Sequence, residues 1–394
     1  MKLKGIATAA LLALAGIATA GAPAPVTAEE RGVTADSITI GAWLPLSGPY
    51  AEYGVNIRAG TNAYFDMINA KGGVNGRKIN WIVEDNAYSP QQTVSIARKL
   101  VTRDNVLALV NVHGTGPTSA TFPFVRDQMK VPFTPVYGGA KEWYDPPKTD
   151  LLGMIMLYIN QMKPVGRWAA SDGHKNIVFM QHIGNIYDEE GDGSEIGVKS
   201  VNPDAKFTRI ALKFGTADYA SVAKQIKDMG ADAIISVQVP QELAALRREL
   251  KRIGVDLPMY TFPANVLQSL IELDKEGMEG LRGISLINSP TGDSPELQEY
   301  RDAMKTYQPD AKPDSISLLA FSMAKVFVEA LKNAKEPLNR ESLMNGYFSL
   351  TDYDTGILPP VTFTPERTLG ATKARRVEVV NGEWKVVGPW EESD

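Results

Sequence analysis

The sequence of 394 residues contains no cysteine and only three histidines. Without cysteine, the chain cannot form disulfides, thiolate metal sites or a cysteine nucleophile, and it cannot carry a lipid on an N-terminal cysteine. The histidines, His113, His174 and His182, include no pair at i, i+4 spacing, so one helix cannot present two of them to a metal. We therefore expect no metal site and no cofactor.

Long apolar runs are also absent beyond the N-terminus. There, Lys2 and Lys4 precede residues 5–20, which carry no charge and are fewer than the roughly 20 needed to cross a bilayer. Small residues up to Ala28 suit cleavage, and Pro23 would interrupt a spanning helix. We predict a cleaved signal peptide over residues 1–28 and a mature protein in the periplasm.

Motifs for catalysis and nucleotide binding are missing as well. Gly114 and Gly116 are not followed by the third glycine of a dinucleotide fingerprint or by the Lys-Ser/Thr pair of a P-loop. The sequence has no G-x-S-x-G nucleophile elbow. A periplasmic hydrolase would need a nucleophile–base pair that we do not find, so we predict that the chain is not an enzyme.

Two runs of charged residues have simpler interpretations than a ligand site. The basic residues at 247, 248, 251 and 252 suit one solvated helix face, so we expect no nucleic-acid partner. The acidic run 188–192 lacks the alternating ligands of a calcium loop. We interpret that run as a solvated loop.

The mature part of the sequence alternates short β-rich runs with longer helical patterns. Such alternation predicts parallel sheets covered by helices on both faces, here in two similar α/β units. Asn381-Gly382 predicts a hairpin near the C-terminus. The predicted strands are 38–42, 79–84, 106–110, 177–180, 207–212, 233–237 and 259–262, and the predicted helices are 55–70, 89–104, 194–200, 218–229, 241–253 and 315–334.

Ligands of open parallel sheets bind beyond the carboxyl ends of the strands. The segment 112–118 takes the chain from a buried strand into a helix, whose first N–H groups contribute about 0.3–1 kcal/mol to binding an exposed anion. The same residues also suit a helix cap and turn, so binding and capping both remain open. Aromatic residues crowd the predicted mouth, namely Trp43, Tyr50, Tyr53, Tyr137, Trp143, Tyr144 and Tyr187.

Several segments resemble the leucine/isoleucine/valine-type periplasmic binding proteins of ABC transporters. These are residues 46–54 (LSGPYAEYG), 68–76 (INAKGGVNG), 84–86 (EDN) and 92–94 (QTV). The resemblance implies a type I periplasmic-binding fold, with two Rossmann-like lobes, parallel sheets and a three-strand hinge. With a first crossing inside 141–162, we expect lobe 1 at 34–155 plus 286–352 and lobe 2 at 156–285 plus 353–394.

The resemblance also implies which positions contact the ligand. Thr115 falls where the family places a serine that holds the ligand carboxylate, with His113 and Gly114 beside it. Gly138, next to Tyr137, falls where a second hydroxyl would be. Tyr53 and Tyr187 match tyrosines that close the pocket from the two lobes, and Gln238 lies near a further contact.

One departure from the family concerns the ligand's amine. The amino-acid binders place an acidic residue where this chain has Pro263, followed by Ala264 and Asn265. A buried ammonium without a counter-charge is costly. Together with the enlargement expected at Gly138, this favours a small carboxylate without an amine, plausible as an aromatic acid.

The function that follows is ligand capture by closure of the cleft and delivery to an ABC permease, with the protein acting as a monomer. Branched-chain or other amino acids are the alternative ligands. A ligand sensor with the same fold is the alternative function.

Overall fold

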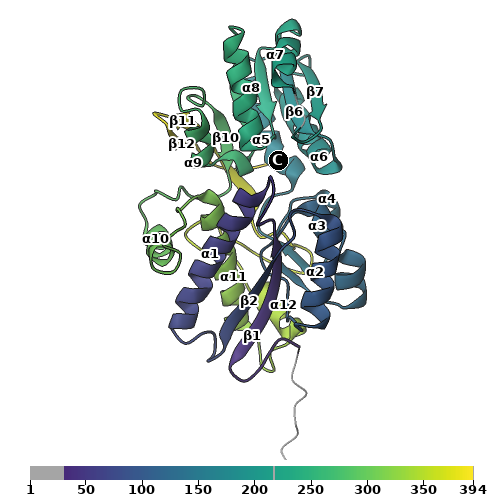
Figure 1. The fold of residues 1–394 in the computed structure, drawn as a ribbon, viewed down its shortest axis with the longest axis vertical. Helices are drawn as coiled ribbons and strands as arrows, with labels where there is room; N and C mark the ends of the chain where they lie inside the picture. The colour runs from purple at the N-terminus through teal and green to yellow at the C-terminus, as the bar shows by residue number, and fades with distance from the viewer. Residues whose placement is uncertain (1–30, 216–217, 394) are drawn as a thin grey trace, which may run out of the picture.

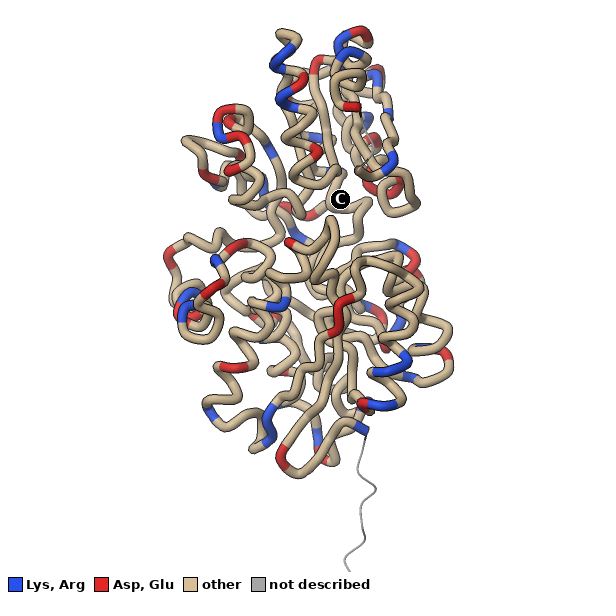
Figure 2. Tube along the Cα trace, in the orientation of Figure 1, with Lys and Arg blue, Asp and Glu red and all other residues tan. Residues whose placement is uncertain are grey.

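Two α/β lobes lie one above the other in the computed structural model, which describes residues 31–215 and 218–393 (Figure 1). The predicted signal peptide at 1–28 falls outside the described residues. The two-lobed α/β architecture predicted from the alternating pattern is confirmed. Figure 2 shows acidic and basic residues interspersed over the outer surfaces of both lobes.

Lobe 1 contains a parallel sheet in which β1 pairs with β2, and β4 lies between β3 and β5. Leu109 bridges Gly41 and Phe133 and so joins the two groups of strands. The strands are β1 (Ser37–Leu44), β2 (Lys78–Asp85), β3 (Val112–His113), β4 (Phe133–Tyr137) and β5 (Leu151–Gly153). The helical segments are α1 (Ala51–Ala70), α2 (Pro90–Thr102), α3 (Thr115–Ser119), η1 (Pro123–Gln128), α4 (Lys141–Tyr144), α10 (Pro295–Tyr307), α11 (Ser315–Asn333) and α12 (Arg340–Phe348).

The strand predicted at 106–110 is not a regular strand. Its residues still bond to β1, since the Val110 N–H donates to the Gly41 carbonyl over 2.9 Å. On the other side, the Leu109 N–H donates to the Pro132 carbonyl and the Leu109 carbonyl accepts from Thr134, but Pro132 and Pro135 have no N–H that could extend this pairing. Asn111, with φ of 59°, then turns the chain before β3 begins.

Lobe 2 contains a seven-stranded sheet in the order β12-β11-β10-β9-β8-β6-β7, in which β11 pairs antiparallel with both β10 and β12 and all other neighbours pair parallel. The hairpin at Asn381-Gly382 is confirmed, with both residues at positive φ. The strands are β6 (Asn176–His182), β7 (Lys206–Leu212), β8 (Ala233–Ser236), β9 (Met259–Thr261), β10 (Arg282–Ser285), β11 (Lys373–Val380) and β12 (Glu383–Glu392). The helical segments are α5 (Tyr158–Ser171), α6 (Asn185–Val201), α7 (Tyr219–Asp228), α8 (Pro240–Arg252), η2 (Pro263–Asn265) and α9 (Gln268–Leu273).

The chain passes between the lobes after β5, after β10 and before β11. The first passage is shorter than the predicted 141–162, because α4 and β5 belong to lobe 1 and α5 begins at Tyr158. Residues 353–370, which we expected in lobe 2, bond to lobe 1: the Gly153 N–H donates to the Thr368 carbonyl over 2.9 Å. We propose that the third passage lies at about 371–373 and that the other predicted lobe bounds stand.

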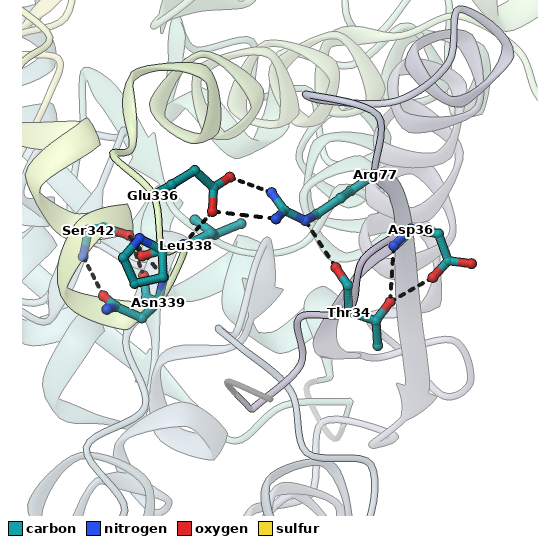
Figure 3. A network of polar contacts seen from close by, with 8 residues as sticks. Thr34, Asp36, Arg77, Glu336, Leu338, Asn339 and Ser342 are labelled. Carbon is teal, nitrogen blue, oxygen red and sulfur yellow. Dashed lines mark hydrogen bonds and ion pairs between the residues drawn. The ribbon is translucent and has the colours of Figure 1, made fainter. Parts of the chain in front are cut away.

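A polar network fixes the start of the described chain to the end of lobe 1 that lies farthest from lobe 2 (Figure 3). Arg77 pairs with Glu336 over 2.5 Å, and its Nε donates to the carbonyl of Thr34 over 3.0 Å. The guanidinium holds the pKa of Glu336 below its usual range. Because Glu336 is more than half exposed, we expect this pair to position the segments more than to stabilise the fold.

Candidate functional site

A cavity of about 170 Å³ lies between the lobes, at the carboxyl ends of the parallel strands of both sheets. One water molecule needs only about 10–15 Å³ of such space, so the cavity is large enough for a small organic ligand. Lobe 1 lines it with Tyr50, Tyr53, Ile57, Tyr88, His113, Gly114, Thr115, Tyr137, Ser315, Ile316 and Leu319, and lobe 2 and the passages between the lobes with Ile155, Tyr158, Gln161, Ile186, Tyr187, Glu190, Val237, Val239, Phe262, Pro263, Ala264, Val266, Ser285, Leu286 and Ile287.

Seven of the nine predicted ligand contacts are among these lining residues: Tyr53, His113, Gly114, Thr115, Tyr137, Tyr187 and Pro263. Four of them, His113, Gly114, Thr115 and Tyr137, lie at or directly after the carboxyl ends of β3 and β4, as the rule on strand ends predicts. Whether these residues contact a ligand remains a prediction. The structure establishes only that they share one cavity.

Gly138 and Gln238 do not line the cavity. A Cβ atom at Gly138 would lie 2.3 Å from the ring of Trp143, so the indole already fills the space. The enlargement that we expected at Gly138 is therefore wrong. Gln238 is fully buried; its side-chain N–H donates to the Tyr219 hydroxyl over 2.9 Å, and its backbone carbonyl accepts from the Asn265 side chain.

The predicted aromatic mouth divides into two groups. Tyr50, Tyr53, Tyr137 and Tyr187 reach the cavity. Trp43, Trp143 and Tyr144 are instead buried in the core of lobe 1 and bond to Thr118, Ser119 and Gly138. Tyr88, Tyr158 and Phe262 line the cavity but were not predicted. Tyr88 follows β2 directly, so the same strand-end rule could have identified it.

His113 lies in an aromatic environment within the cavity wall. Its ring stacks on Tyr53, with centroids 5.8 Å apart and planes at 9°, and it also contacts Tyr88 and Tyr137. Burial lowers the pKa of His113 to about 4, so the ring is neutral at pH 7. In the described part of the chain, its Nδ1 and the Tyr137 hydroxyl have no hydrogen-bond partner. Within the described residues, both atoms are thus buried polar groups without a partner, on residues of the cavity wall.

Thr115 is the first residue of α3. Its hydroxyl and the hydroxyl of Tyr158 are 2.8 Å apart, which joins the start of α3 in lobe 1 to the start of α5. The N–H groups in the first turn of a helix have no partner within the helix, so those of Thr115 and Gly116 are free to bind an acceptor. Gly114 permits the turn before them, with φ of 107°.

Glu190 is a buried carboxyl in the cavity wall, only 2% exposed. Burial and the neighbouring Glu189 raise its pKa well above the usual range. Among the described residues, no hydrogen-bond donor contacts its Oε2. The interpretation of 188–192 as a solvated loop is thus wrong, because these residues form part of α6. Gly193 lets α6 pack closely on α5, since a Cβ there would lie 2.1 Å from the Ile159 carbonyl.

Hydrogen bonds across the cleft hold the lobes together around the cavity. The hydroxyls of Tyr50 and Tyr187 are 3.2 Å apart, and the Lys141 N–H donates to Glu189 over 3.0 Å. The hydroxyl of Ser269 on α9 donates to the Glu52 carboxylate on α1. These contacts close the cavity from the two sides.

The described residues offer neither a cluster of metal ligands nor a membrane-spanning helix. No group of three or more His, Asp or Glu side chains is placed to hold a metal ion. No helix between residues 31 and 393 has the length and apolar character needed to cross a membrane.

The sequence and the fold are both similar to those of known proteins. The sequence profile of the periplasmic binding protein family matches residues 37–383. The leucine-, isoleucine-, valine-, threonine- and alanine-binding protein of Pseudomonas aeruginosa is 26% identical over 316 residues, which cover 77% of this chain and 80% of the relative. The Leu/Ile/Val-binding protein homolog 7 of Brucella suis is 25% identical, over 82% of both chains.

Solved structures agree on the fold. A fatty acid ABC transporter substrate-binding protein from Thermomonospora curvata superposes with a TM-score of 0.83 at 23% identity, covering 93% of this chain and 95% of its own. A branched-chain amino acid ABC transporter protein from Thermus thermophilus with bound valine gives a TM-score of 0.80 at 16% identity, covering 91% and 97%. The resemblance noted in the sequence is therefore confirmed, and the chain belongs to the periplasmic binding protein family.

Proposed function

We propose that this chain is the substrate-binding component of an ABC uptake system and that it binds a small organic acid in the periplasm. The observation that carries the proposal is the cavity between the lobes, which combines apolar walls with unpartnered polar atoms from both lobes. The family match supports a ligand-binding role. Binding would favour the closed arrangement of the lobes, which the membrane permease would then recognise.

The carboxylate end of the ligand is placed by the first turn of α3. Thr115 supplies a hydroxyl, and Thr115 and Gly116 supply N–H groups at the positive end of a helix. No Lys or Arg is among the residues that line the cavity, so these neutral donors are the groups in the wall best suited to an anion. The names of the relatives support this choice, because amino acids and fatty acids share a carboxylate.

The other end of the ligand decides between the two classes that the sequence left open. An aromatic acid without an amine was favoured by a larger space at Gly138 and by the lack of an acid at Pro263. Trp143 fills the first space, and Glu190 places an acid in the cavity from a different element. These observations favour the amino-acid alternative, while the aromatic walls still suit a ligand with an apolar side chain.

A thermal-shift screen of amino acids, aromatic acids and short fatty acids tests the proposal. The Thr115→Val variant keeps the shape of the side chain and removes its hydroxyl. Because hydrogen bonds to charged groups contribute about 1.5–3 kcal/mol, we expect this variant to bind the best ligand about 10- to 150-fold more weakly.

Thr102→Val is the matched control, because Thr102 is exposed at the end of α2 and bonds only to the Arg98 carbonyl. The proposal is wrong if none of these acids stabilises the protein. Equal affinities of the Thr115 variant and its control would instead show that the Thr115 hydroxyl on α3 does not bind the ligand carboxylate.

A further inference from the structure

An aromatic stack joins the two lobes. The ring of Tyr50 in lobe 1 lies between those of Tyr88, in the same lobe, and Phe214, in lobe 2, with centroids 4.1 Å and 5.2 Å apart. Both pairs of rings are close to parallel, at 21° and 25°. Stacked rings attract each other beyond the apolar area that they bury. Phe214, which follows β7, thus contacts lobe 1 without being among the described residues that line the cavity.

On the lobe 1 side, the stack depends on a constrained backbone. Tyr88 has a φ of 60°, and Ala87 before it has a φ of 44°. For a bulky residue such a value is an outlier that the surrounding structure must hold in place, and such outliers cluster at functional sites. Here the side chain of Asn86 accepts from the Tyr88 N–H over 3.1 Å, and that of Asp85 accepts from the Ala87 N–H over 2.8 Å. The position of the Tyr88 ring is therefore closely defined.

On the lobe 2 side, two buried polar residues lie behind Phe214. His182, at the end of β6, meets the ring of Phe214 edge to face, with centroids 5.0 Å apart. Its Nε2 is 2.5 Å from one carboxylate oxygen of Glu242 on α8. The other oxygen of Glu242 accepts from the N–H of Gly215, the residue after Phe214, over 2.9 Å. One carboxylate thus holds both the ring that supports Phe214 and the backbone that carries it.

Glu242 is charged although it is buried. It is 9% exposed, and His182 is 2% exposed. Burial raises the pKa of Glu242, but the bonds from His182 and Gly215 outweigh burial and hold the pKa below its usual range. A carboxylate only accepts hydrogen bonds, so His182 donates to it from Nε2. Neither Glu242 nor His182 is among the described residues that line the cavity.

We propose that Glu242 and His182 are positioning residues: they hold Phe214 against Tyr50 and thereby set how long the closed lobes retain a bound ligand. The inference rests on the proposed function and assigns a role in it to residues outside the cavity wall. A buried carboxylate and its partner contribute little net stability, because desolvation offsets their attraction, so their role here is the geometry that they impose. Opening of the cleft would separate Phe214 from Tyr50, so the stack stabilises the closed state alone.

The rate of ligand release measures the contribution of the stack. Phe214→Leu keeps an apolar side chain and removes the ring. We expect it to release ligand about 2- to 10-fold faster, while association stays nearly constant, because the contact forms only as the lobes close. Stopped-flow experiments with leucine, hydrocinnamate and isocaproate, one acid from each class of the screen, give both rates.

Glu242→Gln distinguishes positioning from a general effect on the fold. The amide keeps the size of the side chain, but its single oxygen can take only one of the two places of the carboxylate oxygens. A shift of the His182 proton to Nδ1 would not restore the network, since that atom is buried and has no partner among the described residues. We expect Glu242→Gln to speed release on its own and to have little further effect in Phe214→Leu, because residues that act through one another are not additive.

Glu249→Gln is the matched control, because Glu249 also lies on α8 but pairs with Arg252. His182→Gln is a second variant, which can still bond to Glu242 but lacks the ring that supports Phe214, and it should also release ligand faster. The inference is overturned, and the proposed function stands, if Glu242→Gln has the same effect with and without Phe214. The same holds if Glu242→Gln and His182→Gln both release ligand at the rate of the control. If none of the three acids binds the wild type, the proposed function fails and the inference fails with it.

Discussion

At the scale of single residues, His113 shows how the cavity sets the chemistry of a side chain. Three tyrosine rings surround its imidazole, and burial lowers its pKa from 6.5 to about 4. Between these two pH values the unfolded chain binds more protons at this residue than the folded one. The contribution of neutral His113 to stability is therefore complete above pH 6.5 and is lost as the pH falls towards 4.

We predict that His113→Phe, which keeps an apolar ring, makes the unliganded protein less sensitive to acid. Urea unfolding of the variant and the wild type at several pH values measures the effect, and the gap between the two curves should change between pH 6.5 and 4. Burial raises the pKa of Asp314 to about 6, so its contribution to stability grows as the pH falls. This contribution is the same in the variant and the wild type. His174→Gln, outside the cavity, is the control. Parallel curves for the variant and the wild type would contradict the prediction.

Some residues of the cavity were predictable from a local rule, and Tyr53, Tyr187 and Pro263 were predicted from the family resemblance. His113, Gly114 and Thr115 follow from the position of their segment between a buried strand and a helix. Glu190 was missed because an acidic run in isolation looks solvated, and only the close packing of α6 on α5 buries it. The extra space predicted at Gly138 is absent because the indole ring of Trp143 packs against this residue, a contact that the sequence does not reveal.

At the scale of elements, the packing of α1 on α11 depends on one glycine. A Cβ atom at Gly60 would lie 1.9 Å from the carbonyl oxygen of Ser317, a backbone atom that cannot turn aside. Each turn of the two helices buries apolar side chains in the same core, including Tyr64 and Phe321, whose rings meet edge to face with centroids 4.8 Å apart. Separating the helices would disturb these contacts.

We predict that Gly60→Ala destabilises the protein by about 1–3 kcal/mol, the usual cost of overpacking, although alanine is the better helix former. The change in the free energy of unfolding in urea measures it. Arg58→Ala on the same helix is the control, because Arg58 is exposed and should shift stability by no more than about 0.5 kcal/mol. A stabilised Gly60 variant would show that α1 and α11 can move apart freely.

Elements were predictable where their signals were local. The helices at 89–104 and 218–229 were predicted close to α2 and α7, which Ser89 and Asp218 cap, and Asn381-Gly382 turns the last hairpin as predicted. The strand at 106–110 was not predictable in detail, because its irregularity comes from two prolines in the neighbouring segment.

At the scale of the whole molecule, the repeated α/β pattern was enough to predict two lobes but not where every segment belongs. Residues 353–370 form neither a helix nor a regular strand, and nothing in their sequence places them against β5 in lobe 1. Two of the contacts between the lobes, Tyr50–Tyr187 and Ser269–Glu52, could not be predicted from the sequence, because each joins residues more than a hundred positions apart. We expect those contacts to slow the release of a ligand from the closed cavity.

The bond from Ser269 on α9 to Glu52 on α1 is well suited to test this point, because neither residue lines the cavity. A bond present only between closed lobes stabilises the bound state and leaves the open state unchanged. Its loss should therefore appear in ligand release and leave association nearly constant.

We predict that Ser269→Ala releases ligand about 2- to 10-fold faster, which corresponds to a net hydrogen-bond contribution of about 0.5–1.5 kcal/mol. Stopped-flow measurement of association and dissociation, with the best ligand from the screen, gives both rates. Ser200→Ala is the control, because the Ser200 hydroxyl donates to Gly197 within α6 and reaches no other element. If Ser269→Ala instead slowed association and left release unchanged, the bond would form before the ligand is enclosed, and the closed arrangement would have to be held by the other bonds between the lobes, including Tyr50–Tyr187 and Lys141–Glu189.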